Sequence, residues 1–332
     1  MMKNAVVLGT GSFGSALAAL LAERGLETTI WGRNAAAVEE INERHSNARY
    51  LPGIQLPESI RATTDFAACA ETDLILFVLP SRCFREVAEN LRNHGVNPNA
   101  VLLSCTKGIE LDTGARMTEV LSETFPENSV AVLSGPSHAE EMAKRMPTAV
   151  VVGCEDDELA MKLQDVFTLP WFRSYRANDV AGIEIGGCVK NIAAIAGGIV
   201  EGCGLGDNSK AALVTRGLAE MVRLGVAMGG QPETFMGLSG VGDLMATCFS
   251  DHSRNTRVGR MLGQGMPLDE IQTRLGMVAE GVPNTESVYQ FAKKHGVRAP
   301  VTELLFELLQ GRLTPDEACQ QLLSRSPRAE TD

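Results

Sequence analysis

The sequence predicts an α/β fold: an N-terminal Rossmann-type doubly wound parallel sheet, followed by a C-terminal, mainly α-helical domain. Three observations lead to this prediction. Apolar, β-branched runs alternate with helical segments over the first half of the chain. A glycine-rich turn joins the first apolar run to the first helix. Near residue 178 the strand-like runs stop and helical periodicity takes over. We therefore expect two domains, residues 1–178 and 179–332.

The glycine-rich turn is the first recognisable motif. Gly9, Gly11 and Gly14 stand at its first, third and sixth positions, after the apolar run 4–8 and before a helix expected over 15–24. Such glycines allow a tight turn, close approach of the backbone to a pyrophosphate, and close packing of the helix on the strand. The helix N-terminus offers free N–H groups to the anion. The motif favours dinucleotide binding, and the alternative is a tight turn in another α/β protein.

The rest of the first half continues the alternation of strand and helix. A strand and the turn after it are expected over residues 27–34, further strands at 73–80, 101–105, 130–133 and 148–152, and a helix at 35–44. The run 73–80 is almost continuously apolar, which is typical of a strand buried on both faces of a parallel sheet. Strands and helices at this spacing imply right-handed crossovers.

The second half shows helical periodicity and almost no strand pattern. Helices are expected at residues 183–201, 211–228, 268–275, 284–295, 300–310 and 314–324. Thr314 is a suitable N-cap, because Pro315 follows it at the first helical position. The tail from about residue 326 is expected to be disordered.

Composition excludes several classes of protein. The net charge of −11 over 332 residues argues against a nucleic-acid partner. The N-terminus has the pattern of a buried strand rather than of a signal peptide, and no apolar run reaches the length of about 18 residues that a membrane span needs. The eight cysteines are scattered without a C-x-x-C pair. We expect a cytoplasmic protein with reduced thiols, no metal site and no membrane-spanning segment.

The end of the second predicted strand bears on the choice of dinucleotide. In NAD-specific sheets a carboxylate at this place accepts a hydrogen bond from the ribose 2′-hydroxyl. Here the chain has Gly32, Arg33 and Asn34. A guanidinium can pair with a 2′-phosphate instead, so Arg33 favours NADP. The alternative is that Arg33 is a solvated loop residue.

Two lysines are placed where folding does not require them. Lys107 directly follows the predicted strand 101–105, at the edge where parallel sheets bind ligands. Lys190 lies inside the apolar stretch 183–201. Burial there would lower its pKa toward neutrality, which suits a general acid or base at a carbonyl group. The alternative is that its side chain extends to the surface.

A polar cluster, Ser253, Arg254 and Asn255, follows a glycine-rich run at 237–244. Three adjacent donors of this kind can surround a phosphate. The alternative is a solvated loop with an N-cap serine. His252 is left without a catalytic role.

Together these features resemble bacterial NAD(P)-dependent glycerol-3-phosphate dehydrogenases over nearly the whole chain. Besides the glycine turn, the motifs that match are NARYLPG (47–53), SCTKGIE (104–110), SGPSHA (134–139), VKN (189–191), KAAL (210–213), TRGLAEM (215–221), GLSGVGDL (237–244), TC (247–248) and SRN (253–255). The resemblance implies reversible hydride transfer between NAD(P)H and the C2 carbonyl of dihydroxyacetone phosphate. The product, sn-glycerol 3-phosphate, would serve phospholipid synthesis. NADP, and also NAD, would be the cofactor, and a homodimer is possible.

The resemblance also implies roles for individual residues. Lys190 would transfer the proton. The substrate would be held by Lys107, Gly135, Ser137, Asp243, Ser253, Arg254 and Asn255. The cofactor would be contacted by Ser12, Phe13, Arg33, Tyr50, Ala139, Val278 and Glu280, joined by Lys107 and Arg254. The family often has another aromatic residue at position 13 and histidine at position 33, so Arg33 keeps a basic group there.

Two other functions are open at this point. A β-hydroxyacid-type dehydrogenase of similar two-domain plan could use the same basic cluster to hold a carboxylate. A catalytically silent NADP-binding sensor would keep the N-terminal glycines but would need neither Lys190 nor the cluster 253–255.

Overall fold

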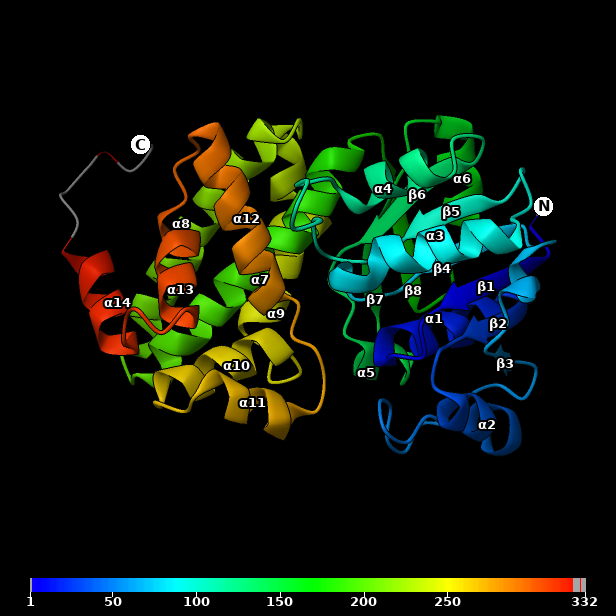
Figure 1. Ribbon diagram of the computed structural model, residues 1–332, viewed down its shortest axis with the longest axis horizontal. Helices are drawn as coiled ribbons and strands as arrows, with labels where there is room; N and C mark the ends of the chain where they lie inside the picture. The colour runs from blue at the N-terminus through cyan, green and yellow to red at the C-terminus, as the bar shows by residue number, and fades with distance from the viewer. Residues whose placement is uncertain (1, 325–328, 330–332) are drawn as a thin grey trace.

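The computed structural model describes residues 2–324 and 329. Apart from residue 329, the tail expected to be disordered from about residue 326 lies outside the described residues. Figure 1 shows a sheet with its flanking helices on one side of the molecule and a group of helices on the other. The predicted fold class is confirmed.

The described strands form one sheet in the order β3-β2-β1-β4-β5-β6-β7-β8. They are β1 (Asn4–Leu8), β2 (Glu27–Trp31), β3 (Arg61–Thr63), β4 (Leu74–Phe77), β5 (Val101–Ser104), β6 (Ser129–Ser134), β7 (Thr148–Gly153) and β8 (Phe172–Ala177). All the predicted strands are present. The two edge strands, β3 and β8, were not predicted from the sequence. β3 is too short to give a pattern, and β8 exposes Arg173, Tyr175 and Arg176 because it lies at the edge.

The sheet is not parallel throughout, which corrects the prediction. β7 pairs antiparallel with β6, with Val132 opposite Gly153, and β8 runs parallel to β7. The connection between β6 and β7 contains only one short helix, α5 (Ala139–Met142). This segment does not cross the sheet, so β7 starts at the edge where β6 ends. The reversal leaves residues 135–139 at that edge, where the other parallel strands also end.

Helices cover both faces of the sheet. They are α1 (Ser12–Glu23), α2 (Ala35–Arg44), η1 (Phe66–Cys69), η2 (Ser81–Cys83), α3 (Phe84–His94), α4 (Met117–Thr124) and α6 (Asp157–Val166), with α5 at the edge. Neighbouring residues of one strand serve opposite faces: Val7 packs in the cluster that holds Leu17 of α1, whereas Val6 packs with Val87 of α3 and Leu121 of α4. This double burial explains why the strand runs are continuously apolar.

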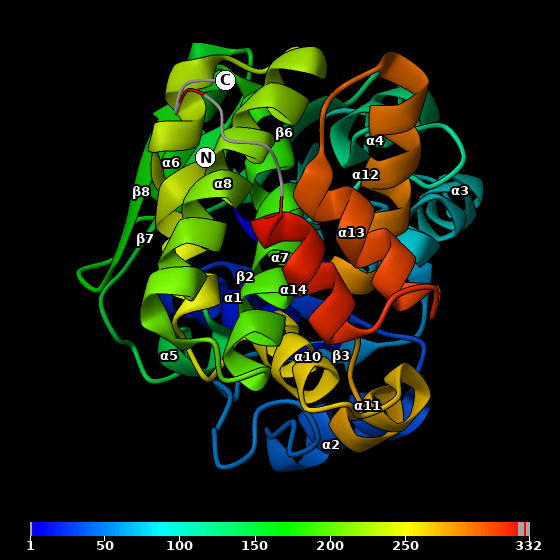
Figure 2. The ribbon, with the colours of Figure 1, turned by 90° about the vertical axis from the view of Figure 1, so that its left-hand side faces the viewer.

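The second half is helical, as predicted, with α7 at its centre (Figures 1 and 2). Its elements are α7 (Val180–Gly202), α8 (Gly206–Ala227), η3 (Pro232–Met236), η4 (Leu238–Gly242), α9 (Asp243–Cys248), α10 (Arg254–Gly263), α11 (Leu268–Leu275), α12 (Gly281–His295), α13 (Pro300–Leu309) and α14 (Pro315–Leu323). Helices α9 and α10 were not predicted, because α9 has only six residues and the start of α10 was interpreted as a polar cluster at 253–255.

The glycines of α7 allow close packing and do not interrupt the helix. A methyl group on Gly198 would overlap the Thr256 carbonyl of α10, and one on Gly259 of α10 would overlap the Ile195 carbonyl of α7. The two helices therefore cross with their backbones in contact. This crossing connects the helix that carries Lys190 to the one that begins with Arg254.

Helix α7 also corrects the expectation about apolar length. By length and composition it could cross a membrane, although no such run was expected from the sequence. Its apolar window is entirely buried against the rest of the protein. A core helix passes the same test of composition, and α7 is packed as one.

Candidate active site

A cavity of about 940 Å³ lies between the sheet and the helical half. Its lining includes the glycine turn, the segments that follow β2, β4 and β5, and residues from α7, α9, α10 and the start of α12. The ligand edge of the sheet thus faces the helical half, as the general rule for open α/β sheets expects.

The glycine turn has a geometry that fits a dinucleotide pyrophosphate. Gly9 has φ +128°, and a Cβ there would overlap the Val78 carbonyl. A Cβ on Gly14 would overlap the carbonyl of Gly9, so the first turn of α1 lies directly on the loop. Gly11 is the N-cap of α1, provides no side-chain cap, and has open space where a Cβ would be. The first N–H groups of α1 are therefore open to an anion in the cavity.

The segment after α2 is tied to this turn by a buried side chain. The Asn47 amide donates to the Thr10 carbonyl and to Ser15 Oγ, both at 2.8 Å. It thereby holds Arg49 and Tyr50 at the cavity, where the Arg49 guanidinium lies 5.3 Å from the centre of the Tyr50 ring. Arg33 lines the same end of the cavity. Among the described lining residues, no carboxylate follows β2.

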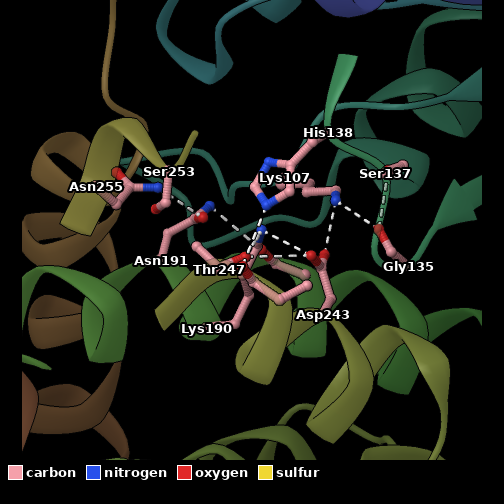
Figure 3. A network of polar contacts seen from close by, with 12 residues as sticks. Lys107, Gly135, Ser137, His138, Lys190, Asn191, Asp243, Thr247, Ser253 and Asn255 are labelled. Atoms are coloured by element: carbon pink, nitrogen blue, oxygen red, sulfur yellow. Dashed lines mark hydrogen bonds and ion pairs between the residues drawn. The ribbon is translucent and has the colours of Figure 1, made fainter. Parts of the chain in front are cut away.

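At the other end of the cavity two lysines share one aspartate (Figure 3). Lys190 Nζ donates to Asp243 Oδ1 at 3.0 Å and to Thr247 Oγ1 at 2.7 Å. Lys107 Nζ donates to Asp243 Oδ2 at 2.6 Å and to the Gly135 carbonyl at 3.0 Å. Asp243 is 2% exposed and Lys190 6% exposed. The cluster therefore holds the Lys190 ammonium and the Asp243 carboxylate away from bulk water, with the partly exposed Lys107 beside them.

The charges of this cluster and its burial set the pKa of Lys190. Burial lowers the pKa of Lys190 to about 8, with Asp243 opposing the shift and Lys107 adding to it. Burial alone would raise the pKa of the Asp243 carboxyl, but the ammonium groups of Lys107 and Lys190 outweigh it and the net shift is downward. The aspartate stays ionised, and Lys190 can both give and take a proton near neutrality.

The polar cluster at 253–255 lies at the start of α10. Ser253 caps this helix, its Oγ accepting from the Thr256 N–H at 3.1 Å. Asn255 donates to Asn191 Oδ1 at 2.8 Å and accepts from the Gly281 N–H at 2.9 Å. Ser253 is therefore the N-cap of α10, and it also lines the cavity beside Asn255.

Arg254 connects the two halves of the molecule. Its guanidinium donates to Ser12 Oγ in α1 at 2.9 Å and to the Val278 carbonyl at 3.1 Å. Ser12 belongs to the first turn after the glycine loop. Arg254 thus reaches the part of the cavity beside the glycine turn from α10, a helix of the other half of the chain.

Comparison with known proteins decides the family. A family model for the N-terminus of NAD-dependent glycerol-3-phosphate dehydrogenase matches residues 4–160, and the model for its C-terminus matches residues 179–320. A Lysinibacillus sphaericus protein named glycerol-3-phosphate dehydrogenase (NAD(P)+) is 47% identical, over 100% of this chain and 99% of that protein. The chain belongs to the NAD-dependent glycerol-3-phosphate dehydrogenase family.

Two further relatives support this membership. A Streptomyces griseus protein of the same name is 47% identical over 98% of each chain. The crystal structure of glycerol-3-phosphate dehydrogenase from Coxiella burnetii is 38% identical, with a TM-score of 0.94, and covers 98% of this chain and 99% of that one.

Most of the residues expected at the site of this dehydrogenase line the one cavity. These are Gly9, Gly11, Ser12, Phe13, Gly14, Arg33, Tyr50, Lys107, Ser137, Ala139, Lys190, Ser253, Arg254, Asn255, Val278 and Glu280. Gly135 and Asp243 do not line it. The Gly135 carbonyl accepts from Lys107, and the Asp243 carboxylate accepts from both Lys107 and Lys190. Ser137 Oγ donates to the same Gly135 carbonyl at 2.9 Å.

Sequence reasoning missed other polar residues of the cluster. Thr247 accepts from Lys190, Asn191 accepts from Asn255, and the Asn284 amide donates to the Lys107 carbonyl at 2.8 Å. Thr247 stands four residues after Asp243 on α9, so the i, i+4 spacing would have placed the two side chains together had the helix been predicted. His138, which also lines the cavity, gave no signal beyond its place beside Ser137.

Proposed function

We propose that this chain catalyses reversible reduction of dihydroxyacetone phosphate to sn-glycerol 3-phosphate with NADPH or NADH. One observation carries the proposal. The buried Lys190 ammonium, held by Asp243 and Thr247, opens onto a cavity whose far end has an uncapped, glycine-rich helix start. A carbonyl placed at Lys190 would lie within reach of a dinucleotide bound at α1.

Lys190 acts on the carbonyl oxygen of the substrate. Its ammonium stabilises the negative charge that develops on this oxygen during reduction and then delivers the proton. In the reverse direction the neutral amine accepts the proton of the C2 hydroxyl. When bound, the nicotinamide supplies or takes up the hydride. Asp243 and Thr247 keep the lysine Nζ in one place throughout.

The donors around Lys190 hold the phosphate group. Ser253, Arg254 and Asn255 line the cavity together, and Lys107 adds a second positive charge near Lys190. Their contacts with the phosphate would fix the carbonyl at Lys190, so binding energy from the non-reacting end is used for orientation. A carboxylate substrate would offer these groups fewer acceptor oxygens, which favours a phosphate ester over the hydroxyacid alternative.

The direct test follows the absorbance of NADPH after dihydroxyacetone phosphate is added to the purified protein. Decay is expected with this substrate and not with ketopantoate, a carboxylate ketone. Binding of NADPH without turnover would favour a sensor and overturn the proposal.

The pKa of Lys190 predicts opposite pH profiles for the two directions. Because the pKa is lowered to about 8, the ammonium needed for reduction is lost as the pH rises through 8. The neutral amine needed for oxidation of glycerol 3-phosphate appears over the same range. We expect kcat/KM for reduction to fall, and for oxidation to rise, across that pH. Profiles that move in the same direction would exclude Lys190 as the proton donor.

Arg33 is proposed to favour NADPH by pairing with its 2′-phosphate. Replacing Arg33 with glutamate should lower the kcat/KM ratio of NADPH to NADH by about 10–100-fold, because an attractive charge becomes a repulsive one. Arg92, an exposed arginine in the last turn of α3, provides the control Arg92→Glu. An unchanged ratio in Arg33→Glu would remove Arg33 from cofactor selection.

We also propose the division into a cofactor domain, residues 1–178, and a substrate and catalytic domain from residue 179. It is supported by Asp179, the N-cap of α7 immediately after β8. A homodimer and a role in phospholipid synthesis are proposed from the family resemblance, and sedimentation of the purified protein tests the first. A cytoplasmic location is proposed because all eight cysteines are unpaired.

A further inference from the structure

The substrate end of the cavity is rich in hydrogen-bond donors. Lys107, Lys190 and Arg254 can only donate. The Asp243 carboxylate has both oxygens engaged, Oδ1 by Lys190 and Thr247 and Oδ2 by Lys107. Donors suit the phosphate and the carbonyl of dihydroxyacetone phosphate. The free hydroxyl of this substrate carries its one donor hydrogen at neutral pH, and it needs an acceptor when it leaves water.

His138 offers such an acceptor. Its Nε2 lies 3.1 Å from the Ala246 carbonyl in α9. A carbonyl only accepts, so Nε2 carries the hydrogen, and in the neutral ring Nδ1 is left as an acceptor. Nδ1 has no hydrogen-bond partner in the part of the chain that the structure describes. His138 lines the cavity, and Figure 3 shows its ring beside the side chains of Lys107 and Lys190.

The surroundings keep this ring neutral. Burial lowers the pKa of His138, and the ammonium groups of Lys190 and Lys107 lower it further, against the opposing effects of the Ala246 carbonyl and Asp243. A neutral imidazole beside two cations is able to accept at Nδ1, which an imidazolium is not.

Asn191 Oδ1 and Ser137 Oγ are among the other oxygens of the cavity that could compete for the hydroxyl hydrogen. Asn191 Oδ1 already accepts from Asn255 at 2.8 Å. Ser137 Oγ donates to Gly135 and retains lone pairs, but a hydroxyl rotates and serves a donor or an acceptor equally. His138 differs from both, because its contact with Ala246 fixes which nitrogen accepts.

We infer that His138 Nδ1 accepts a hydrogen bond from the free hydroxyl of the substrate, and so makes the enzyme select a hydroxymethyl ketone phosphate over its deoxy counterpart. This inference rests on the proposed function. The contact lies at the hydroxymethyl end of the substrate, away from the carbonyl oxygen, so it governs selection between substrates and leaves proton transfer to Lys190. A site that forms a hydrogen bond with a substrate hydroxyl discriminates against an analogue that lacks this hydroxyl.

The test compares dihydroxyacetone phosphate with hydroxyacetone phosphate, which has a methyl group in place of the hydroxymethyl group. In His138→Gln the amide nitrogen can still donate to the Ala246 carbonyl, but no acceptor remains at the position of Nδ1. We expect kcat/KM for dihydroxyacetone phosphate to fall about tenfold, the value of one hydrogen bond, and kcat/KM for hydroxyacetone phosphate to change less than twofold. NADPH affinity, measured by fluorescence, should stay unchanged and shows that the variant is folded.

Two further variants distinguish a hydrogen bond from His138 to the substrate hydroxyl from a role of His138 in positioning α9. His138→Asn keeps an acceptor near the position of Nδ1 and loses the contact with Ala246, so the preference for the hydroxyl should persist. His252→Gln changes the neighbouring ring, 5.9 Å away, and should leave the preference unaltered. Equal losses on both substrates in His138→Gln would show that the residue only positions α9, and would overturn the inference. Failure of the wild-type protein to reduce dihydroxyacetone phosphate would instead overturn the proposed function, and the inference with it.

Discussion

Replacing Lys190 with alanine is expected to lower kcat for dihydroxyacetone phosphate by about 10²–10⁴, the range typical of a lost general acid. The lysine is the proton donor of the proposed reaction, and its Nζ is held at 3.0 Å from Asp243 and 2.7 Å from Thr247. Steady-state kinetics with NADPH, combined with a fluorescence titration of NADPH, measures turnover and cofactor binding separately.

Two controls accompany this variant. Lys190→Met fills the same space without the charge and should lose turnover to a similar degree. Lys162→Ala changes an exposed lysine on α6 and should leave kcat unaltered. NADPH should bind both Lys190 variants with nearly normal affinity, because the dinucleotide end of the cavity is built by other residues. Turnover near the wild-type rate in Lys190→Met would eliminate the lysine as proton donor.

Replacing Asp243 with asparagine should produce the second large effect, on stability and on the pH profile together. The carboxylate neutralises two cations in a buried site, and breaking such a cluster by removing one partner costs about 3–5 kcal/mol of the free energy of unfolding. Asp243 also holds the pKa of Lys190 up against burial. Without it the pKa of Lys190 falls further, because burial and the Lys107 charge act unopposed by a carboxylate. The decline of the reduction rate with pH should therefore begin well below pH 8.

Denaturant unfolding and the pH dependence of kcat/KM measure these two effects. Asp251→Asn is the matched control, since Asp251 pairs with Arg260 at 2.9 Å on an exposed loop. The control should leave both the unfolding midpoint and the profile nearly unchanged. If Asp243→Asn kept the wild-type pH profile, the carboxylate would have no part in setting the protonation of Lys190.

The fold was predictable wherever local pattern and burial agree. The central strands β4 and β5 are buried on both faces, so their residues are almost all apolar and the sequence predicted both strands. The edge strand β8 alternates buried residues, Phe172 and Ser174, with exposed ones, Arg173 and Tyr175. Its charged side chains leave no apolar run from which the strand could be predicted. The antiparallel course of β7 depends on how the chain returns after β6, which no local pattern encodes.

The sequence by itself determined the chemical groups of the site and the elements that carry them. The glycine spacing at 9–14 predicts a phosphate-binding turn. A lysine within the apolar run of α7 predicts that its charge is paired or functional, because burying an unpaired charge is costly. Both signals are local, because the spacing of the glycines and the hydrophobicity around Lys190 can be recognised within a short segment of the sequence.

Only the tertiary structure decided how the groups act together. Asp243 comes to lie between Lys107 and Lys190, and Arg254 reaches Ser12 from the far half of the chain. The pKa of Lys190 follows from that arrangement, since desolvation and neighbouring charges depend on packing between distant segments. The accepting nitrogen of His138 likewise depends on a carbonyl that α9 brings to it. Proton affinity and hydrogen-bond direction are properties of an environment, and the fold creates that environment.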